Sequence, residues 1–269
     1  MAVSEMIYQL KDLKVSFPDL SRKPLLGAAP RVDVLKGLTF DIPKGEILGI
    51  VGGSGSGKST LGRALIRLIE PDEGSISFEG TDITHMPEER LRPLRRRFQM
   101  IFQDPMSSLN PRRRVGGIIA GPLKLQGFDN VRNRVDEALD MVGLPRHFAS
   151  RFPHELSGGQ RQRVGIARAI ALRPEFILAD EIVSGLDVSS QAQVLTLLDS
   201  LVQELGLTLA FISHDLSVVR RLCTRILVLY QGEIVENAES AELFDDPKSD
   251  YTRTLLDAIP LPDPAQAWF

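Results

Sequence analysis

A glycine- and serine-rich stretch that ends in lysine and serine is the part of the sequence best suited to chemistry. Residues 52–59 fit the pattern GxxxxGK(S/T). Its glycines let the backbone curl so that successive N–H groups point at one phosphate. Lys58 can reach the β- and γ-phosphates of a nucleotide, and the Ser59 hydroxyl can ligate Mg²⁺. The residues that we expect to bind the nucleotide are Gly52, Gly53, Ser54, Gly55, Ser56, Gly57, Lys58, Ser59 and Thr60.

The segments on either side of this phosphate loop support that interpretation. The apolar run at 46–51 predicts a buried strand, and apolar residues recur at helical spacing after the loop, as far as Pro71. These residues are Leu61, Ala64, Leu65 and Leu68. A helix that starts at the loop presents its positive end to the same phosphate. A turn that merely joins two elements would not need this full pattern in this context.

Acidic residues and a histidine follow two later apolar runs. The run 176–180 predicts a buried strand that ends in Asp180, where a nucleotide enzyme of this kind holds its metal. The adjacent Glu181 can orient and polarise an attacking water. His214 ends another predicted strand and can donate a hydrogen bond to a γ-phosphate, although a lone histidine at such a position is more often structural.

Composition and charge are those of an ordinary folded chain. The 269 residues suffice for one large domain, or for a domain with a subdomain. The net charge of −3 argues against a general role in binding nucleic acid. No apolar run approaches the length of a membrane span, and residues 1–6 do not resemble a secretory signal. The single cysteine, Cys223, excludes an internal disulfide and is expected to be buried on a helix, so we expect a cytosolic setting.

The pattern of predicted elements indicates an α/β fold with an antiparallel part and a helical insertion. Strands are expected at 7–16, 34–42 and 74–80, with a loop at 18–32. From Gln160 onward, helices alternate with short apolar strands, which implies a mostly parallel core sheet. The predicted domains are a nucleotide-binding core with its antiparallel part at 1–87 and 159–236, a helical subdomain at 88–158 and a C-terminal extension at 237–269.

An arginine cluster and a proline-rich tail are two further features of the sequence. Arginines cluster within the predicted helical subdomain, and they form either a solvated face or a docking surface for an acidic partner. These arginines are Arg92, Arg95, Arg96, Arg97, Arg112, Arg113 and Arg114. The chain from Asp245 onward is rich in proline and is expected to form a partly extended arm.

Several ordered motifs together resemble the ATP-binding cassette (ABC) family. Residues 156–160 read LSGGQ and match the family's signature motif without a substitution. Gln103 looks like its Q-loop glutamine, residues 184–187 resemble its D-loop, and His214 falls at its switch histidine. The resemblance covers about residues 7–236 and implies the fold of a P-loop ABC ATPase.

The resemblance also implies how these residues are used. ABC ATPase domains pair head to tail and enclose two ATP molecules. The residues that would act on the ATP held by this chain are Lys58, Ser59, Gln103, Asp180, Glu181 and His214, with Ser59, Gln103 and Asp180 around Mg²⁺. The residues that would close over the ATP of the opposite subunit are Ser157, Gly158, Gly159 and Gln160. A glycine-softened helix cap explains the two glycines but leaves Gln160 unexplained.

The resemblance gives expected roles to two further positions and marks two others as departures from the family pattern. Asp187 would contact the partner subunit, and Phe17 matches the aromatic residue that stacks on adenine, although it can equally be a core residue. Ile182 stands where the family usually has proline, and Gly185 stands where alanine is usual. Neither departure removes a catalytic group. The added backbone freedom at Gly185, close to Asp187, can however alter the coupling between the two ATP sites.

The C-terminal part narrows the resemblance to one group of importers. In residues 243–256, Pro247 is followed by Tyr251 and Thr252 and then by a leucine pair, as in the ATPases that import peptides, opines and nickel. Residues 103–112 are close to the same group, and the loop before Val34 resembles an insertion in its second, oligopeptide- and dipeptide-type ATPase. The other ATPase type carries a cysteine-rich tail, which a chain with one cysteine cannot supply.

The interpretation is therefore an ATP-hydrolysing subunit of a bacterial importer at the cytoplasmic face of the inner membrane. Its expected partners are a second ABC ATPase, in a heterodimer or a homodimer, two transmembrane permeases and an extracytoplasmic solute-binding protein, with no nucleic acid. The main alternative is a non-transport ABC ATPase that acts on the ribosome or DNA, which usually has two cassettes or long insertions. An exporter ATPase and a degenerate regulatory cassette are disfavoured by the tail and by the intact motifs.

Overall fold

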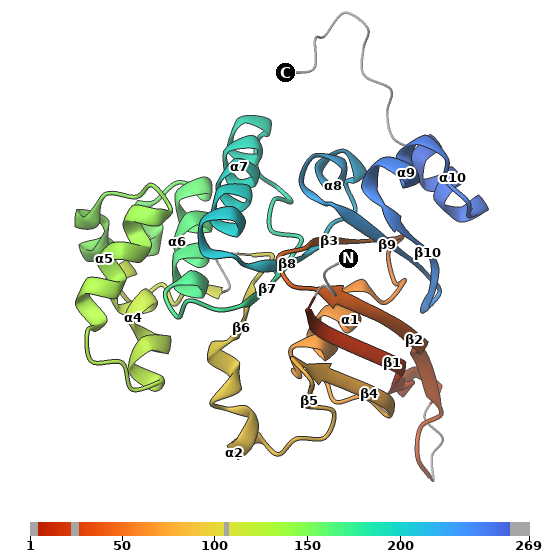
Figure 1. The fold of residues 1–269 in the computed structure, drawn as a ribbon. Helices are drawn as coiled ribbons and strands as arrows, with labels where there is room; N and C mark the ends of the chain where they lie inside the picture. Colours follow the sequence, from red (N-terminus) through yellow and green to blue (C-terminus); the bar gives the residue numbers. More distant parts are fainter. Residues whose placement is uncertain (1–4, 23–26, 105–107, 259–269) are drawn as a thin grey trace, which may run out of the picture.

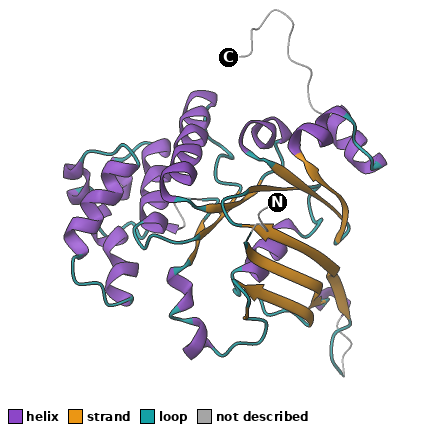
Figure 2. Ribbon diagram, viewed as in Figure 1, coloured by secondary structure: helices purple, strands orange, loops and turns teal. Residues whose placement is uncertain are grey.

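The chain folds around two β-sheets, and most of its helices lie to the left of and above them in Figure 1, whereas the helix at residues 58–65 lies against the smaller sheet. The structure, a computed structural model, describes residues 5–22, 27–104 and 108–258. Helices gather opposite the antiparallel sheet, with the second sheet between them (Figure 2). Within the described residues, no helix is both long and apolar enough to cross a membrane.

The larger sheet has six strands in the order β10-β9-β3-β8-β7-β6. Its strands are β3 (Ile47–Val51), β6 (Phe98–Ile101), β7 (Phe176–Asp180), β8 (Thr208–Ile212), β9 (Arg225–Tyr230) and β10 (Glu233–Glu239). All neighbours pair in parallel except β9 and β10, which form an antiparallel hairpin. The mostly parallel core sheet is confirmed.

Strand β6 differs from its predicted place. It lies within 88–158, the range predicted for the helical subdomain, yet it pairs with β7 at the edge of the six-stranded sheet. Its residues Phe98 and Ile101 are buried, so this strand belongs to the core, and the longer inserted helices begin after it. The remaining domain boundaries stay predictions.

The smaller sheet has four antiparallel strands in the order β2-β1-β4-β5. Its strands are β1 (Met6–Pro18), β2 (Arg31–Pro43), β4 (Glu73–Phe78) and β5 (Thr81–Asp82). This confirms the predicted antiparallel part. Of the predicted loop at 18–32, residues 20–22 form a 3₁₀ turn and residues 23–26 lie outside the described residues.

Four helices of the core lie where the sequence pattern indicates helices. They are α1 (Lys58–Leu65), α6 (Gly158–Ile170), α7 (Val188–Leu205) and α8 (Leu216–Leu222). The inserted helices are α4 (Val115–Leu125) and α5 (Val131–Met141). The shorter helical turns are α2 (Glu88–Leu91), η1 (Leu20–Arg22), η2 (Leu94–Arg96), η3 (Arg146–Ser150) and η4 (Pro153–Glu155). Cys223 is buried directly after α8.

Two predictions about the helices are wrong. Helix α1 ends at Leu65, so Leu68 does not continue its apolar face and is half exposed. The tail is not an extended arm where it is described, because α9 (Ser240–Asp245) and α10 (Asp250–Asp257) are helical. Ser249 caps α10 by accepting a hydrogen bond from the backbone N–H of Tyr251. The prolines at 260, 262 and 264 lie outside the described residues.

Two hydrophobic cores lie on opposite faces of the larger sheet. Along β3, Ile47 and Val51 belong to one core, and Leu48 and Ile50 belong to the other, as the alternation of a strand requires. Helices α4–α8 pack into the first core, which α6 enters through Ile166, Ala167, Ala169 and Ile170. Helix α1 and the antiparallel sheet fill the second core. The helical insertion is therefore continuous with one face of the sheet that carries the phosphate loop.

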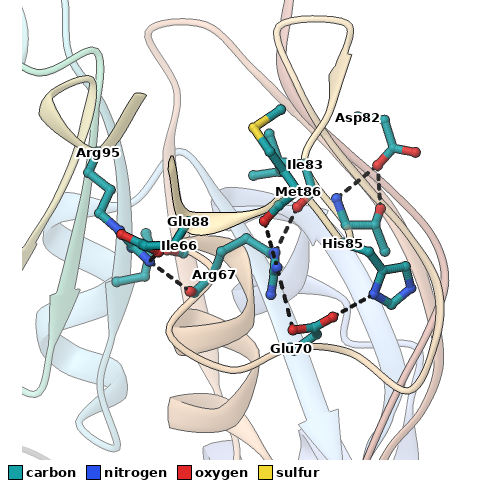
Figure 3. Close-up of polar contacts among 10 residues, drawn as sticks. Ile66, Arg67, Glu70, Asp82, Ile83, His85, Met86, Glu88 and Arg95 are labelled. Carbon is teal, nitrogen blue, oxygen red and sulfur yellow. Dashed lines mark hydrogen bonds and ion pairs between the residues drawn. The ribbon is translucent and has the colours of Figure 1, made fainter. Parts of the chain in front are cut away.

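The end of α1 is attached to the segment that leads to β6 (Figure 3). The guanidinium of Arg67, a buried residue, donates to the carbonyl oxygens of Ile83 and Met86. Arg95 donates to the carbonyl oxygens of Ile66 and Arg67 and forms an ion pair with Glu88. The bonds from Arg95 satisfy carbonyl groups just past the end of α1, which the end of a helix leaves without partners. Arg95 thus acts within the chain rather than as part of a docking surface.

A second arginine of the same cluster is part of a charged network between the sheets. Arg97 forms ion pairs with Glu79 and Glu175, and Lys44 lies 2.5 Å from Glu79. Burial raises the pKa of Glu79, but the hydrogen bonds from Lys44 and Arg97 outweigh it and lower the pKa to about 2. A lowered carboxyl pKa means that Glu79 stabilises the fold most above the pKa of the unfolded chain, about 4.3.

We expect Glu79→Gln to lower the free energy of unfolding by about 1–2 kcal/mol at neutral pH, because two charged hydrogen bonds lose their anion. The difference between the variant and the parent should shrink as the pH falls from about 5 toward 2, where Glu79 itself is protonated. Urea denaturation over this pH range measures both effects. Glu73→Gln, which removes an exposed pair with Lys14, should change stability by less than about 0.5 kcal/mol. Equal losses in the two variants would contradict the role of the network.

Candidate nucleotide site

The phosphate loop lies between β3 and α1, which is the predicted context. Gly52 has φ +148°, and a Cβ there would lie 2.2 Å from the carbonyl oxygen of Leu229, so only glycine fits. Gly57 is the N-cap residue of α1 and offers no side chain to cap the helix. No side chain of the N-cap residue therefore caps the first N–H groups of α1. These groups can instead donate to an anion.

The lysine of the loop is folded against the loop itself. Lys58 is buried, and its Nζ donates hydrogen bonds to the carbonyl oxygens of Gly52, at 2.9 Å, and Gly53, at 2.8 Å. Burial lowers the pKa of Lys58, and the nearby carboxylates of Glu181 and Asp180 oppose that shift. The ammonium group is thus held at the centre of the loop by neutral acceptors that a phosphate can replace.

Ser59 and Asp180 meet beside the loop, although they are far apart in the sequence. The Ser59 hydroxyl donates to Asp180 Oδ1 at 3.1 Å. Asp180 is buried at the end of β7; burial raises its pKa, and the hydrogen bond from Ser59 opposes that shift. The two oxygens are hard donors of the kind that Mg²⁺ prefers. Among the described residues no three His, Cys, Asp or Glu side chains form a metal site, so the rest of the coordination would come from phosphates and water.

Gln103, Glu181 and His214 form one cluster next to that pair. Gln103 Nε2 donates to Glu181 Oε2 at 2.8 Å, and His214 Nδ1 lies 3.5 Å from Glu181 Oε1. The carboxylate of Glu181 therefore has one neighbour on each oxygen. The predicted role of Gln103 as a metal ligand falls to its Oε1, because an amide nitrogen only donates, and here it donates to Glu181.

The backbone around Glu181 has an unusual conformation. Glu181 has φ 48°, the left-handed region that residues other than glycine rarely adopt. Ile182, in place of the usual proline, is buried in the first core. Gly185 has φ +78°, so an alanine there would be strained, and this glycine supplies a required conformation in addition to flexibility.

The signature lies against the D-loop and the start of α7. A Cβ on Gly158 would lie 3.9 Å from Leu186, and a Cβ on Gly159 would lie 3.5 Å from Ser190. Asp187 is the N-cap residue of α7 and accepts from the N–H of Ser190 at 2.9 Å. The hydrogen bonds from Ser190 lower the pKa of Asp187. Asp187 thus has a capping role within the chain, whatever it contacts in a partner.

Gln160 has a local explanation that the sequence analysis missed. Ser157 is the N-cap residue of α6, and its hydroxyl accepts from the N–H of Gln160 at 3.3 Å. The Gln160 side chain in turn accepts from the N–H of Ser157 at 3.0 Å. This is a capping box, and its S-x-x-Q spacing was visible in the sequence. A helix cap therefore accounts for Gln160 as well as for the glycines.

Two aromatic residues, Phe17 and Tyr251, bear on the nucleotide site in different ways. Phe17 is 40% exposed at the end of β1, which removes the core alternative; its stacking on adenine stays a prediction. Tyr251 was not assigned to the site, yet its hydroxyl accepts a hydrogen bond from the N–H of Gly53 at 2.8 Å. No local spacing signals a contact between residues this far apart in the sequence.

The fold and this site define an ATPase cassette, because the chain combines a phosphate loop, a strand-end acid pair with a glutamine and a histidine, and a helix that begins with two glycines. The sequence model of the ABC transporter family matches residues 35–184. The chain belongs to the ABC transporter family, and it is an ATP-hydrolysing subunit of that family.

Comparisons with individual sequences and solved structures also match the chain to ATP-binding subunits and ATP-binding cassettes. The chain is 53% identical to a putative peptide import ATP-binding protein of Brucella ovis, over 86% of this chain and 74% of that protein. It is 50% identical to the oligopeptide transport ATP-binding protein AppF of Bacillus subtilis, over 97% of this chain and 80% of AppF. Among solved structures, the ATP-binding cassette MJ0796, a dimer in a post-hydrolysis state with ADP and Pi, matches with a TM-score of 0.75 and 30% identity, over 87% of this chain and 98% of that chain. A second match is cbiO1 of Clostridium perfringens, part of the ABC transporter complex cbiONQ, with a TM-score of 0.78 and 28% identity, over 90% of this chain and 92% of that chain.

Proposed function

We propose that the chain is the ATPase subunit of a bacterial importer that takes up peptides or related small solutes. The observation that supports this most is 50% identity with an oligopeptide transport ATP-binding protein along 97% of the chain. The similarity includes the region of α10, where the tail resembles that of peptide, opine and nickel importers. The solute itself would be selected by other subunits.

In this proposal the phosphate loop and Asp180 hold the nucleotide. Lys58 exchanges the carbonyl oxygens of Gly52 and Gly53 for the β- and γ-phosphates of ATP, while the N–H groups at the start of α1 surround the phosphate chain. Ser59 and Asp180 are the residues that would hold Mg²⁺. When bound, Mg²⁺ neutralises charge on the β- and γ-phosphate oxygens.

Glu181 is the group that we assign to the attacking water. One carboxylate oxygen would accept a hydrogen bond from the water, which orients it and makes it more nucleophilic. Gln103 and His214 flank that carboxylate at 2.8 Å and 3.5 Å, and His214 is exposed enough to donate to a γ-phosphate instead. The chemistry then needs only positioning and charge stabilisation.

The signature residues would serve a second ATP, held by a partner ATPase. The phosphate loop already serves one nucleotide, so a second anion site at the start of α6 is useful only across an interface. The joint position of the signature beside Leu186 and Ser190 supports one shared interface for the signature and the D-loop. We favour a heterodimer with a related ATPase over a homodimer, because of the loop before Val34 and the single cysteine.

Two transmembrane permeases would anchor this dimer at the cytoplasmic face of the inner membrane, with an extracytoplasmic solute-binding protein on the other side. Residues 104–114, of which 105–107 lie outside the described residues, would lie beside a permease, and Arg112 and Arg113 in this stretch are exposed. The double change Arg112→Glu and Arg113→Glu should reduce the recovery of permeases with this chain by about tenfold, because it reverses two charges in the contact. Recovery of the partner ATPase should not change, since the signature lies elsewhere. Loss of both, or of neither, would contradict this placement.

The test of the proposal is affinity purification of the tagged chain from detergent-solubilised native membranes. A related ATPase and two multi-span proteins in the eluate would support the importer, and the associated binding protein would identify the solute. Ribosomal or DNA-repair proteins without membrane proteins would overturn it and favour a non-transport ATPase.

A further inference from the structure

The C-terminal helix α10 reaches the phosphate loop through one side chain. Tyr251, in the first turn of α10, accepts a hydrogen bond at its hydroxyl from the N–H of Gly53 at 2.8 Å. The match to the family model ends at residue 184, far before α10. The extension therefore contacts the loop that binds the nucleotide, although it lies outside the conserved cassette segment matched by that model.

The contacted peptide unit is also the one that holds the catalytic lysine. The N–H of Gly53 and the C=O of Gly52 belong to the same planar peptide, so their directions are linked. Lys58 Nζ donates to that C=O at 2.9 Å, while Tyr251 accepts from that N–H. A peptide between two glycines has few steric restraints against rotating as a unit. Tyr251 and Lys58 restrain it from its two sides.

Tyr251 is itself held firmly by rigid elements. Its ring lies 4.1 Å from that of Tyr230, at the end of β9, measured between ring centroids. The carboxylate of Glu236, a buried residue of β10, accepts from the N–H groups of Lys248 at 2.8 Å and Ser249 at 3.0 Å. These bonds fix the start of α10 against the sheet, so the tyrosine hydroxyl has a defined position relative to the loop.

We propose that Tyr251 is a positioning residue for the phosphate loop. Its hydroxyl fixes the Gly52–Gly53 peptide and thereby orders the loop around Lys58 before ATP arrives. Without the hydroxyl, the loop samples more conformations, and nucleotide binding must supply the ordering. Helix α10 is then part of the nucleotide site, and this conclusion requires no assumption about peptides, permeases or a partner ATPase.

The test compares Tyr251→Phe with Tyr230→Phe in the purified full chain. Both changes remove one hydroxyl from the same pair of neighbouring rings, but the Tyr251 hydroxyl accepts from the N–H of Gly53 in the loop, whereas the Tyr230 hydroxyl accepts from the Gln231 side chain. Tyr251→Phe should raise the Kd for ATP and the KM for hydrolysis about two- to tenfold, the value of one neutral hydrogen bond, with kcat nearly unchanged. Tyr230→Phe should leave both constants within about twofold of the parent.

Hydrogen exchange in the chain labelled with ¹⁵N-glycine measures the exchange rate of the Gly53 amide. This rate would not change if Tyr251 served only to pack the helix. The Gly53 amide should exchange faster in Tyr251→Phe than in the parent and in Tyr230→Phe. An unchanged ATP Kd, or a thermal destabilisation with normal ATP affinity and normal Gly53 exchange, would overturn the proposal. Because ATP binding to the isolated chain needs no transport partner, this result is independent of the pull-down.

Discussion

Replacing Glu181 with glutamine is expected to slow ATP hydrolysis by about 10²- to 10⁴-fold, the usual contribution of a general base. The amide has almost the same size, so contacts with Gln103 and His214 can persist, but it cannot take a proton from water. The Kd for ATP should stay close to that of the parent, because Lys58, Ser59 and the loop are untouched. Single-turnover hydrolysis and nucleotide titration measure the two quantities separately.

The slow variant should also accumulate in an ATP-bound dimer, which light scattering after size-exclusion chromatography detects. The dimer is measured with the partner ATPase where the pull-down recovers one. Glu204→Gln, on an exposed position of α7, is the matched control and should leave turnover unchanged. Normal hydrolysis by Glu181→Gln would remove Glu181 from the role proposed for it.

Gly158→Asp is expected to abolish ATP-dependent dimerisation and to reduce turnover by about 10²-fold or more. A Cβ at Gly158 meets only Leu186, at 3.9 Å, and an acid in the first turn favours the helix, so α6 should fold normally. The new carboxylate would nevertheless face the γ-phosphate of the partner's ATP, and two like charges at contact distance repel strongly. Binding of ATP to the chain's own phosphate loop should be unaffected.

Gly158→Asn separates charge from size in this experiment. The amide has the same shape as the carboxylate without its charge, so the variant should retain a substantial part of the dimerisation and turnover. If the asparagine and aspartate variants fail equally, bulk rather than charge is responsible. If both behave like the parent, the start of α6 does not face a nucleotide.

Much of the fold could be predicted from local pattern, because buried strands and amphipathic helices leave regular spacing in the sequence. The strand before the phosphate loop, the strand that ends at Asp180 and helix α8 all lie where the pattern placed them. The grouping of Gln103 with Glu181 follows from the edge that parallel strands share, since β6 and β7 are neighbours and each residue follows its strand.

The features that were missed depend on contacts between distant residues. The tail was expected to be extended because of its prolines, but α10 is stabilised by Glu236 and by the Ser249 cap. Strand β6 was assigned to the helical insertion because charged residues surround it, and only its pairing with β7 shows that it belongs to the sheet. Gln160 is different, because its capping box depends on a local S-x-x-Q spacing that can be recognised in the sequence alone.

Helix α6 and strand β7 form a single helix–strand unit with a different task at each end. The helix has 13 residues, about 20 Å at 1.5 Å per residue, and its last two turns are packed in the first core. In the head-to-tail dimer proposed above, Ser157 at one end meets the partner's nucleotide, and Glu181 at the other end acts on the chain's own. In that dimer, occupancy of one site would be coupled through this unit to the catalytic base of the other, and the Hill coefficient of ATP hydrolysis should depend on how rigidly Ile166 and Ile170 are packed.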